Sequence, residues 1–496
     1  MNVLTWFERA AARFPGEPAL EVDGTCLTYA ELRELVERLA ARLHAAGAPR
    51  RVERLAARLH AAGAPRRVGL LANRSVLACA GYLAVLRAGA TVVPLNPQHP
   101  PERVRELVAK TGVELLLTED SWGRGELKVP VLRAGTDEPF GRAREVPVGP
   151  DDIAYVICTS GSTGTPKAVP VSHGNLDAYL TEVAARYGIG PGSRVSGNFE
   201  LTFDGSVHDM FVTLGQGGTL VVPRAGALLS PVRAVNALRL THWFSVPSLI
   251  SFAERLGTLR PGAMPTLRCS IFGGEAVPME ALRSWKRAAP NSDVEVLYGP
   301  TELTIACTGY RLPREVSRWP STPNGVAPIG ECFPSLEFRV LDPSGRPATR
   351  GELCVRGPQR FAGYLDPADD AGRFAPGGWY RTGDLVTVEG GVLLHLGRTD
   401  QQVKVRGHRI ELGEVETALR ALPGVRDAIA LAVPTEGEPE LAAAVGGDCD
   451  PDALQAGLRD RLPSYMLPRR ITVLDRLPLN ANGKLDRRAL RSELEL

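Results

Sequence analysis

The chain has 496 residues, with 58 basic and 56 acidic side chains and a formal net charge of +2. A net charge this close to zero gives no strong field of one sign, which argues against nonspecific attraction to nucleic acid or to an acidic membrane. The length exceeds what one hydrophobic core normally organises, so we expect two or more domains.

The cysteines and the N-terminus indicate the compartment. The eight cysteines are scattered without a Cys-x-x-Cys pair, which predicts reduced thiols in a cytoplasmic protein and neither a disulfide framework nor a zinc site. The first residues lack the basic head and apolar core of a secretory signal. The apolar stretch 76–95 is interrupted by Arg87, so no run is long enough to span a membrane.

One segment occurs twice in tandem. Residues 36–51 read VERLAARLHAAGAPRR, and residues 52–67 repeat them without a change. Apolar residues at helical spacing and a closing Gly-Ala-Pro predict a helix and a stop in each copy. We interpret the pair as a recent duplication or an error in the recorded sequence, because a solenoid needs at least three units. We expect one copy to pack in the fold and the other to bulge out as a surface helix or loop.

Deleting one copy, for example residues 52–67, is expected to preserve activity and to leave the melting temperature no lower, because a bulging copy adds no core packing. Thermal unfolding and an activity assay of the deletion variant check this. A collapse of solubility on deletion would show instead that the fold needs both copies.

Beyond the repeat, the two kinds of element alternate. Apolar runs predict strands at 68–72, 91–95 and 113–118, and helices are predicted at 75–88 and 102–111. This alternation through about residue 310 predicts an α/β fold of mainly parallel sheets layered with helices.

The pattern changes in the last third of the chain. Glycine and proline punctuate short strands from 320 to 396, which predicts a small β-rich subdomain. The residues after 400 mix strands with predicted helices at 413–421 and 451–461, which predicts a small α+β domain. We therefore expect a large N-terminal domain, 1–399, and a small, hinged C-terminal domain, 400–496.

A loop of small residues follows one predicted buried strand. The apolar run 153–158 predicts that strand, and Thr159–Thr165 consists only of glycine, serine and threonine. Unshielded backbone N–H groups and hydroxyls form a cradle for phosphate oxygens, and Lys167 adds a positive charge. The loop is not a Walker A site, because Gly164 is followed by Thr-Pro-Lys. A plain linker is the alternative reading of such a loop.

Lysine is rare in this chain, which otherwise uses arginine as its basic residue. The lysines are at positions 110, 128, 167, 286, 404 and 484. Lysine offers a compact point charge that arginine does not. Its placement at Lys167, Lys404 and Lys484, in segments of unusual composition, favours functional roles there.

The segments of unusual composition form an ordered set of motifs. They are Thr159–Lys167, Phe203–Phe211, Tyr298–Glu302, Gly351–Gly357, Tyr380–Asp384, Gly397–Asp400, Val405–Glu414 and Asn482–Lys484. The set resembles the adenylate-forming superfamily, and most closely the amino-acid adenylation domains of nonribosomal peptide synthesis. The resemblance covers nearly the whole chain.

The resemblance implies a two-step reaction with ATP and Mg²⁺. A carboxylate attacks the α-phosphorus of ATP, giving an acyl-adenylate and pyrophosphate, and a thiol then takes the acyl group. Attack on a phosphate needs positioned donors and cations. By similarity, Lys167, Glu302 and Lys484 are the catalytic residues. The implied ATP-binding residues are Thr159, Ser160, Gly161, Ser162, Thr163, Gly164, Gly274, Glu275, Tyr298, Thr301, Asp384 and Arg398.

Individual roles also follow from the resemblance. Glu302 would hold Mg²⁺, Tyr298 would stack on adenine, and Asp384 would accept hydrogen bonds from both ribose hydroxyls. Arg398 would support the ribose or the phosphates, and Lys484 would bridge the substrate carboxylate and ATP oxygens. Taken singly, Glu302 is also typical of a helix start, Asp384 of a turn and Lys484 of a solvated surface.

Lys484 lies on the predicted small domain and the loop of small residues on the large one, so the reaction requires the domains to close. The resemblance implies that the small domain then swings about Asp400 to present another face for thioester formation. Gly407 would lie near the incoming thiol arm. Such alternation is a known way to run two reactions in one site.

Asp204 stands where amino-acid-activating relatives pair a carboxylate with the substrate ammonium, although a capping Asp before Gly205 is the alternative. The pocket residues matched by motif spacing are Gly205, His208, Ser245, Ile271, Gly273, Leu297, Ile305 and Ala306. This lining is small and neutral, and a buried charge needs a partner. We therefore expect a neutral amino acid as substrate.

The chain departs from the family pattern at three positions. Ala168 replaces a usual glycine, Asp209 a frequent glutamate, and His208 a frequent aromatic residue. At these positions the chain resembles free-standing carrier-protein ligases more than modules of a large synthetase. The His208 change leaves open a shifted amino group, so a β-amino acid is also a possible substrate. The chain ends at Leu496, shortly after Lys484, so we expect an acyl or peptidyl carrier protein in trans. No nucleic-acid or membrane partner is expected.

Two other functions remain open at this point. An acyl- or aryl-coenzyme A ligase is the alternative enzyme, although Asp204 and Tyr298–Glu302 argue against it. A catalytically silent sensor on the same fold is the third reading. It would be expected to have lost a catalytic residue, whereas Lys484, Glu302 and Asp384 are all present.

Overall fold

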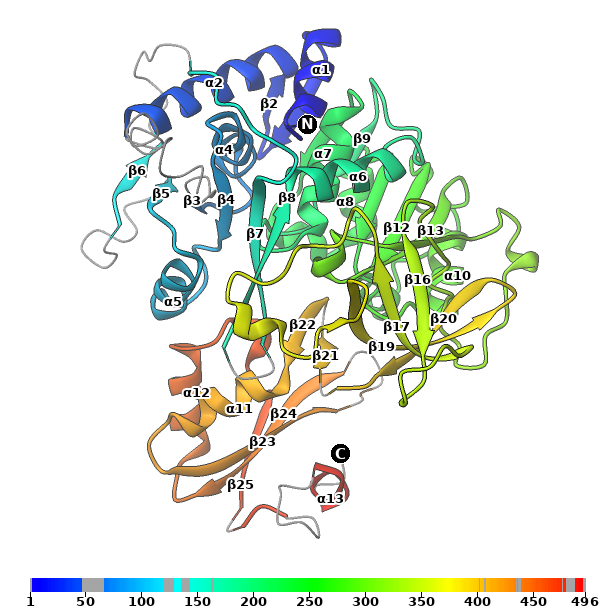
Figure 1. Cartoon of the computed structure of the whole chain (residues 1–496). Coiled ribbons are helices and arrows are strands. Elements are labelled where there is room, and N and C mark those ends of the chain that lie inside the picture. The colour runs from blue at the N-terminus through cyan, green and yellow to red at the C-terminus, as the bar shows by residue number, and fades with distance from the viewer. Residues whose placement is uncertain are drawn as a thin grey trace. The chain divides into compact units, whose positions relative to one another are not determined.

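Figure 1 shows a computed structural model of the chain. The structure describes residues 2–46, 67–119, 129–134, 143–161, 165–400, 402–405, 407–433, 435, 439–474, 476–478 and 487–493. The chain divides into two compact units. Unit 1 comprises Met1–Pro97, Val108–Ile157 and Ala168–Gly397, and unit 2 comprises Gln98–Leu107, Cys158–Lys167 and Arg398–Leu496.

A six-stranded sheet has the order β6-β5-β3-β4-β7-β8, and its first five strands pair in parallel. Strands β3, β4 and β5 are apolar runs that are almost wholly buried, as expected where helices cover both faces of a parallel sheet. The strands are β3 (Arg67–Leu71), β4 (Thr91–Leu95), β5 (Leu115–Thr118), β6 (Val131–Arg133), β7 (Ile153–Thr159) and β8 (Lys167–Ser172).

A nine-stranded sheet has the order β15-β14-β13-β12-β11-β9-β10-β1-β2. Its central strands are parallel, and antiparallel strands close both edges. The strands are β1 (Pro18–Val22), β2 (Thr25–Thr28), β9 (Arg194–Ser196), β10 (Thr219–Val222), β11 (His242–Ser245), β12 (Cys269–Gly273), β13 (Asp293–Tyr298), β14 (Thr308–Arg311) and β15 (Glu331–Cys332).

A third sheet completes unit 1. Its strands pair in the order β16-β17-β19-β18, and β20 pairs with β19. The neighbours β16–β17, β17–β19 and β18–β19 are antiparallel. The strands are β16 (Glu337–Leu341), β17 (Arg350–Arg356), β18 (Phe374–Ala375), β19 (Trp379–Glu389) and β20 (Val392–Arg398).

Local signals start several helices. At α2, the Thr28 hydroxyl accepts from the backbone N–H of Glu31, and the Glu31 carboxylate accepts from the backbone N–H of Thr28. Among the described residues up to 288, the α-helices are α1 (Thr5–Arg13), α2 (Tyr29–Ala45), α4 (Val76–Arg87), α5 (Pro101–Thr111), α6 (His173–Val183), α7 (Gly205–Gly215), α8 (Pro231–Ala237), α9 (Ser248–Arg255) and α10 (Met279–Ala288). Short 3₁₀ turns are η1 (Ala225–Leu229), η2 (Thr301–Leu303), η3 (Val316–Arg318) and η4 (Pro367–Asp370).

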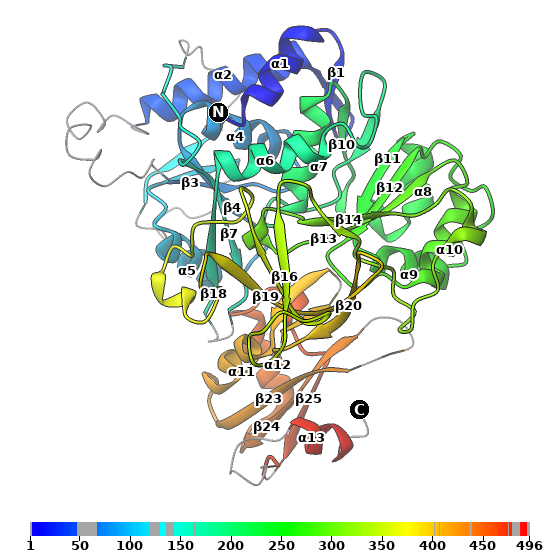
Figure 2. The same cartoon turned by 45° about the vertical axis from the view of Figure 1, so that its right-hand side comes forward.

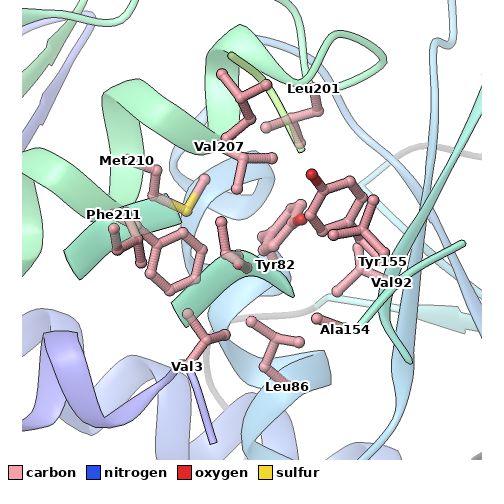
Figure 3. Packing of buried hydrophobic residues seen from close by; sticks show 14 of the residues in the cluster. Val3, Tyr82, Leu86, Val92, Ala154, Tyr155, Leu201, Val207, Met210 and Phe211 are labelled. Atoms are coloured by element: carbon pink, nitrogen blue, oxygen red, sulfur yellow. The ribbon is translucent and has the colours of Figure 1, made fainter. Parts of the chain in front are cut away.

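Two hydrophobic cores organise unit 1. In the first, Tyr82 of α4 and Tyr155 of β7 meet Val207, Met210 and Phe211 of α7, as Figure 3 shows. The second core lies between the strands β11–β13 and the helices α8–α10, which the turned view in Figure 2 brings forward. The first core therefore surrounds the start of α7, where Asp204 lies.

Unit 2 has its own core around α11 and a small sheet. Strand β23 pairs antiparallel with β24, β24 pairs parallel with β25, and β21 and β22 form a separate antiparallel ribbon. The elements are β21 (Gln402–Val405), β22 (His408–Glu411), α11 (Leu412–Arg420), β23 (Val425–Val433), β24 (Glu440–Gly447), α12 (Pro451–Arg459), η5 (Ser464–Met466), β25 (Arg470–Leu474) and α13 (Arg487–Glu493).

The predicted fold class is confirmed: parallel sheets layered with helices, a β-rich part and a small α+β part are all present. In the first copy of the repeat, Val36, Leu39 and Leu43 of α2 are buried, whereas residues 47–66 lie outside the described residues. No helix within the described part of the chain has the length and apolarity needed to cross a membrane.

Candidate active site

Asp204 lies immediately before α7, in unit 1. Its side chain forms no capping hydrogen bond, and its Oδ2 is buried without a hydrogen-bond partner among the described residues. Burial raises the pKa of the Asp204 carboxyl from 3.8 to about 6, while the Thr301 hydroxyl opposes this rise. A buried carboxylate oxygen without a donor is costly unless a ligand supplies one.

Gly205 and His208, one turn apart at the start of α7, stand beside aromatic rings. A Cβ at Gly205 would lie 2.8 Å from the ring of Phe199, so only glycine fits. The Tyr179 hydroxyl lies 2.6 Å from His208 Nδ1, and Tyr187 packs against the same imidazole at a ring distance of 5.6 Å. Burial lowers the pKa of His208 to about 3, so this imidazole is neutral at physiological pH.

The Ser245 hydroxyl has a hydrogen-bond partner on its own strand. The Ser245 hydroxyl accepts from Trp243 Nε1 at 2.8 Å, on the face of β11 that packs in the second core. Alternate side chains of a strand point to opposite faces, so Phe244 lies on the other face. Its ring is 4.9 Å from His208 and 4.8 Å from Phe199. Phe244, which motif spacing did not select, therefore lies beside His208 and Phe199, and the place of Ser245 in the pocket stays a prediction.

The remaining pocket residues fall together on strand ends of the nine-stranded sheet and on the segment after β13. Ile271, Leu297, Ile305 and Ala306 are buried in the same core as Phe244. A Cβ at Gly273 would lie 2.6 Å from the carbonyl oxygen of Leu297, so the two strands approach closely there. The structure brings these five residues together in unit 1.

Tyr298 and Asp384 are in direct contact. The Tyr298 hydroxyl donates to Asp384 Oδ2 at 2.8 Å, and His395 Nε2 lies 3.0 Å from Asp384 Oδ1. Burial, and then the Asp384 carboxylate, raise the pKa of Tyr298 well above its usual value, so the phenol is protonated. Asp384 therefore accepts from a phenol at one oxygen and lies beside an imidazole at the other. His395 was not predicted from the sequence.

Glu302 is fully buried, at 0% exposure, in the turn η2. The Tyr364 hydroxyl donates to its Oε1 at 2.6 Å, which fixes one carboxylate oxygen. The nearby loop after β12 contains Gly274 with φ of +84° and Glu275, whose Oε2 accepts from the backbone N–H of Ser248 at 3.2 Å. Tyr364 was missed by sequence reasoning, although its position shortly after Gly351–Gly357 was a usable signal.

The described part of the phosphate-loop motif belongs to unit 2. Thr159 Oγ1 is buried without a hydrogen-bond partner in the described residues, whereas the Ser160 hydroxyl donates to Arg409 O at 2.7 Å and accepts from Glu411 N at 3.2 Å. A Cβ at Gly161 would lie 1.8 Å from Thr165 O, so this turn requires glycine. Lys167 is buried. Ser162, Thr163 and Gly164 lie outside the described residues.

Arg398 and Asp400 form a two-pronged ion pair in unit 2. Arg398 Nε and Nη2 lie 2.7 Å and 2.9 Å from the two oxygens of Asp400. Such fork geometry is a strong, specific form of charge pairing. The expected hinge residue is thus held by the residue expected to support the nucleotide. Lys484 lies outside the described residues.

Comparison with known proteins tests the resemblance. Residues 48–365 match the AMP-binding enzyme family, and residues 414–484 match the AMP-binding enzyme C-terminal domain. Phosphinothricin tripeptide synthetase PhsC of Streptomyces viridochromogenes is 39% identical over 98% of this chain, which spans 45% of that protein. The chain spans less than half the length of the first curated relatives it matches.

Two solved structures share the fold. The adenylation domain AlmE of Vibrio cholerae, in complex with glycyl-adenosine-5′-phosphate, matches with a TM-score of 0.82 and 28% identity, covering 99% of this chain and 97% of AlmE. PA1221, which contains adenylation and PCP domains, matches with a TM-score of 0.82 and 25% identity, covering 99% of this chain and 84% of PA1221. The chain therefore belongs to the AMP-binding enzyme family, and it is an AMP-forming ligase similar to the adenylation domains of nonribosomal peptide synthetases.

Proposed function

We propose that this enzyme activates an amino acid as its aminoacyl-adenylate. The observation that carries the proposal is the buried Oδ2 of Asp204, which has no hydrogen-bond partner among the residues that the structure describes. An ammonium group supplies both the hydrogen bond and the opposite charge that this oxygen lacks. A substrate acid without an amino group would leave the oxygen unsatisfied, which argues for an amino acid over the acids of coenzyme A ligases.

The substrate side chain is proposed to be neutral. His208 is neutral because of its burial, and the other side chains proposed to line the pocket are buried and uncharged: Phe244, Ser245, Ile271, Leu297, Ile305 and Ala306. None of these offers a full charge to a buried charged side chain, which would need one. Both α- and β-amino acids remain within the proposal, because an ammonium one carbon further out can still reach a carboxylate.

ATP and Mg²⁺ are the proposed cofactors. Tyr298 and Asp384 would hold the nucleoside, and the donors of Thr159–Lys167 would hold the phosphates. Glu302 fits a magnesium ligand, because it presents a buried carboxylate and Mg²⁺ favours one or two carboxylates together with phosphate oxygens. Bound there, the ion would neutralise charge that develops on the phosphates. Lys167 and Lys484 are proposed to stabilise charge on the reacting oxygens.

The proposed acceptor is the phosphopantetheine thiol of an acyl or peptidyl carrier protein supplied in trans, in a cytoplasmic pathway of natural-product synthesis. The presence of a PCP domain with the adenylation domain in PA1221 supports a carrier as acceptor. Asp400 is the proposed hinge of a small C-terminal domain, 400–496, that would serve adenylation and thiol transfer in turn, with Gly407 near the thiol arm in the second step.

Amino-acid-dependent ATP–pyrophosphate exchange tests the proposal. The panel contains α- and β-amino acids, each with the matched acid that lacks the amino group. Exchange with one amino acid and not with its deaminated counterpart is expected, because only the amine pairs with Asp204. Exchange confined to amine-free acids would reassign the enzyme to the coenzyme A ligases, and no exchange at all would favour a silent sensor.

Substrate capture is expected to weaken as the pH falls through about 6. The pKa of Asp204 is about 6 in the free enzyme, and only the ionised carboxylate pairs with an ammonium. The value of kcat/KM for the amino acid should be level above pH 7 and fall about tenfold per pH unit well below 6, since this parameter reports the free enzyme. Steady-state exchange rates between pH 5 and pH 8 check this.

The control for this profile is kcat/KM for ATP at saturating amino acid. The substrate ammonium then occupies the Asp204 carboxylate and lowers its pKa, so the inflection near 6 should move to lower pH. An inflection near 6 in both profiles would assign the titration to a different group.

A further inference from the structure

Five hydrogen bonds join the segment 359–364 to the segment 302–306, both in unit 1. Two of them hold Glu302: the backbone N–H of Phe361 donates to its carbonyl oxygen at 3.0 Å, and the Tyr364 hydroxyl donates to its Oε1 at 2.6 Å. The other three join Gln359 to residues that follow Glu302 in the chain, between positions 303 and 306.

Gln359 is a fully buried amide, at 0% exposure. Its Nε2 donates to the carbonyl oxygens of Leu303 at 3.2 Å and Ala306 at 2.7 Å, and its own carbonyl oxygen accepts from the Thr304 hydroxyl at 2.6 Å. Its Oε1 has no hydrogen-bond partner within the described part of the chain. The side chain therefore acts here through its two N–H donors, which both point at one turn.

That turn is strained. Thr304 has φ of +58° and Ile305 has φ of +73°, and both are β-branched residues, for which the left-handed region is a genuine outlier. A residue in this conformation persists only where the surrounding structure holds its backbone. The carbonyl groups that Gln359 grips belong to the residues on either side of this pair. The side-chain amide thus bridges the residues before and after the strained pair, and we call its two hydrogen bonds to Leu303 and Ala306 the Gln359 clamp.

We propose that Gln359 is a positioning residue for the amino-acid pocket. By holding the backbone from Leu303 to Ala306 in its strained shape, it sets the places of Ile305 and Ala306, which line the pocket under the proposed function on which this inference rests. Glu302 is held independently by Phe361 and Tyr364. Loss of these Gln359 hydrogen bonds is therefore expected to weaken binding of the amino acid, through Ile305 and Ala306. Binding of ATP, which involves Glu302, should be unaffected.

The test is Gln359→Met, which keeps the length and bulk of the side chain and removes both N–H donors. In ATP–pyrophosphate exchange, the KM for the amino acid should rise at least tenfold while the KM for ATP changes by less than about twofold, a tenfold change being about 1.4 kcal/mol. Thr304→Val, which removes only the hydroxyl bond, should act in the same direction with a smaller effect. The Thr304→Val variant provides the test if Gln359→Met does not fold.

The matched control is Gln455→Met. Gln455 is a half-buried glutamine whose Nε2 donates to a carbonyl oxygen, that of Pro468, at 3.1 Å in unit 2. Its loss should leave both KM values within about twofold. A melting temperature lowered in Gln359→Met with both KM values unchanged would show a merely structural role and overturn the inference. An equal rise of both KM values would overturn it as well.

Hydrogen–deuterium exchange tests the clamp apart from activity. Amides of the peptide that covers Leu303–Ala306 should exchange at least tenfold faster in Gln359→Met than in the unchanged chain or in Gln455→Met, because the turn opens locally. Unchanged protection would overturn the inference. If the unchanged chain catalyses no exchange with any amino acid, the proposed function fails, and the protection data still decide whether Gln359 holds the turn.

Discussion

Replacing Asp204 by asparagine is expected to lower kcat/KM for the amino acid by about 10²- to 10³-fold. Removing one partner of a buried charge pair costs about 3–5 kcal/mol, and the Asp204 carboxylate, the protein partner in the proposed pair with the substrate ammonium, is buried. Exchange kinetics of Asp204→Asn with the substrate found in the panel check this. The KM for ATP should stay nearly unchanged, because Tyr298 and Asp384 are untouched.

The same substitution should stabilise the free enzyme at pH 8. The pKa of Asp204 is raised from 3.8 to about 6 in the fold, so the folded state favours the protonated form and loses this contribution as the pH rises through 6. Above that pH the ionised, buried carboxylate destabilises the fold, because its Oδ2 has no hydrogen-bond partner among the described residues, and asparagine removes the charge. We expect the melting temperature of Asp204→Asn to exceed that of the unchanged chain by roughly 2 °C or more at pH 8.

Two results would contradict this assignment of Asp204. A gain in melting temperature that is as large at pH 5 as at pH 8 would show that the carboxylate charge is not its source. An equal loss of activity on the amino acid and on its deaminated analogue would show that Asp204 does not bind the substrate ammonium. The deaminated analogue is thus the matched control on the substrate side.

Replacing Lys484 by alanine is expected to lower adenylate formation by 10²-fold or more while sparing thiol transfer. The resemblance places its ammonium between the substrate carboxylate and ATP oxygens, where one lost donor to developing charge costs about 10²–10³ in rate. Transfer from a presynthesised aminoacyl-adenylate to the proposed carrier thiol should retain most of its rate, because we propose that this step uses another arrangement of the small domain. Pyrophosphate exchange and carrier loading measure the two steps separately.

Lys110→Ala is the matched control for Lys484. Lys110 pairs with Asp369 at 3.2 Å and is another of the few lysines of the chain, so its loss removes the same charge at a place with no proposed role. Both half-reactions should stay within about twofold. Equal loss of both steps in Lys484→Ala would argue against the two-arrangement account.

The residues of the proposed amino-acid pocket show how far motif spacing alone can predict a binding site. Motif order alone selected Ile271 and Leu297, which are buried in one core, and His208, which contacts Tyr179 of the same core. It did not select Phe244 of β11, because a strand exposes alternate side chains to opposite faces and motif spacing does not show which face a residue occupies. Only the partners, Trp243 for Ser245 and His208 for Phe244, reveal the register.

The sequence by itself determined the family, the fold class and the residue types of the chemistry, since each depends on local periodicity or on an ordered set of motifs. Only the tertiary structure reveals the polar contacts of these residues. Tyr364 donates to Glu302, His395 lies beside Asp384, and Gln359 donates to the strained turn. These contacts join residues 11 to 62 positions apart in the chain. No local propensity encodes such pairs, because they form only when separate elements pack and every buried polar atom must find a donor or an acceptor.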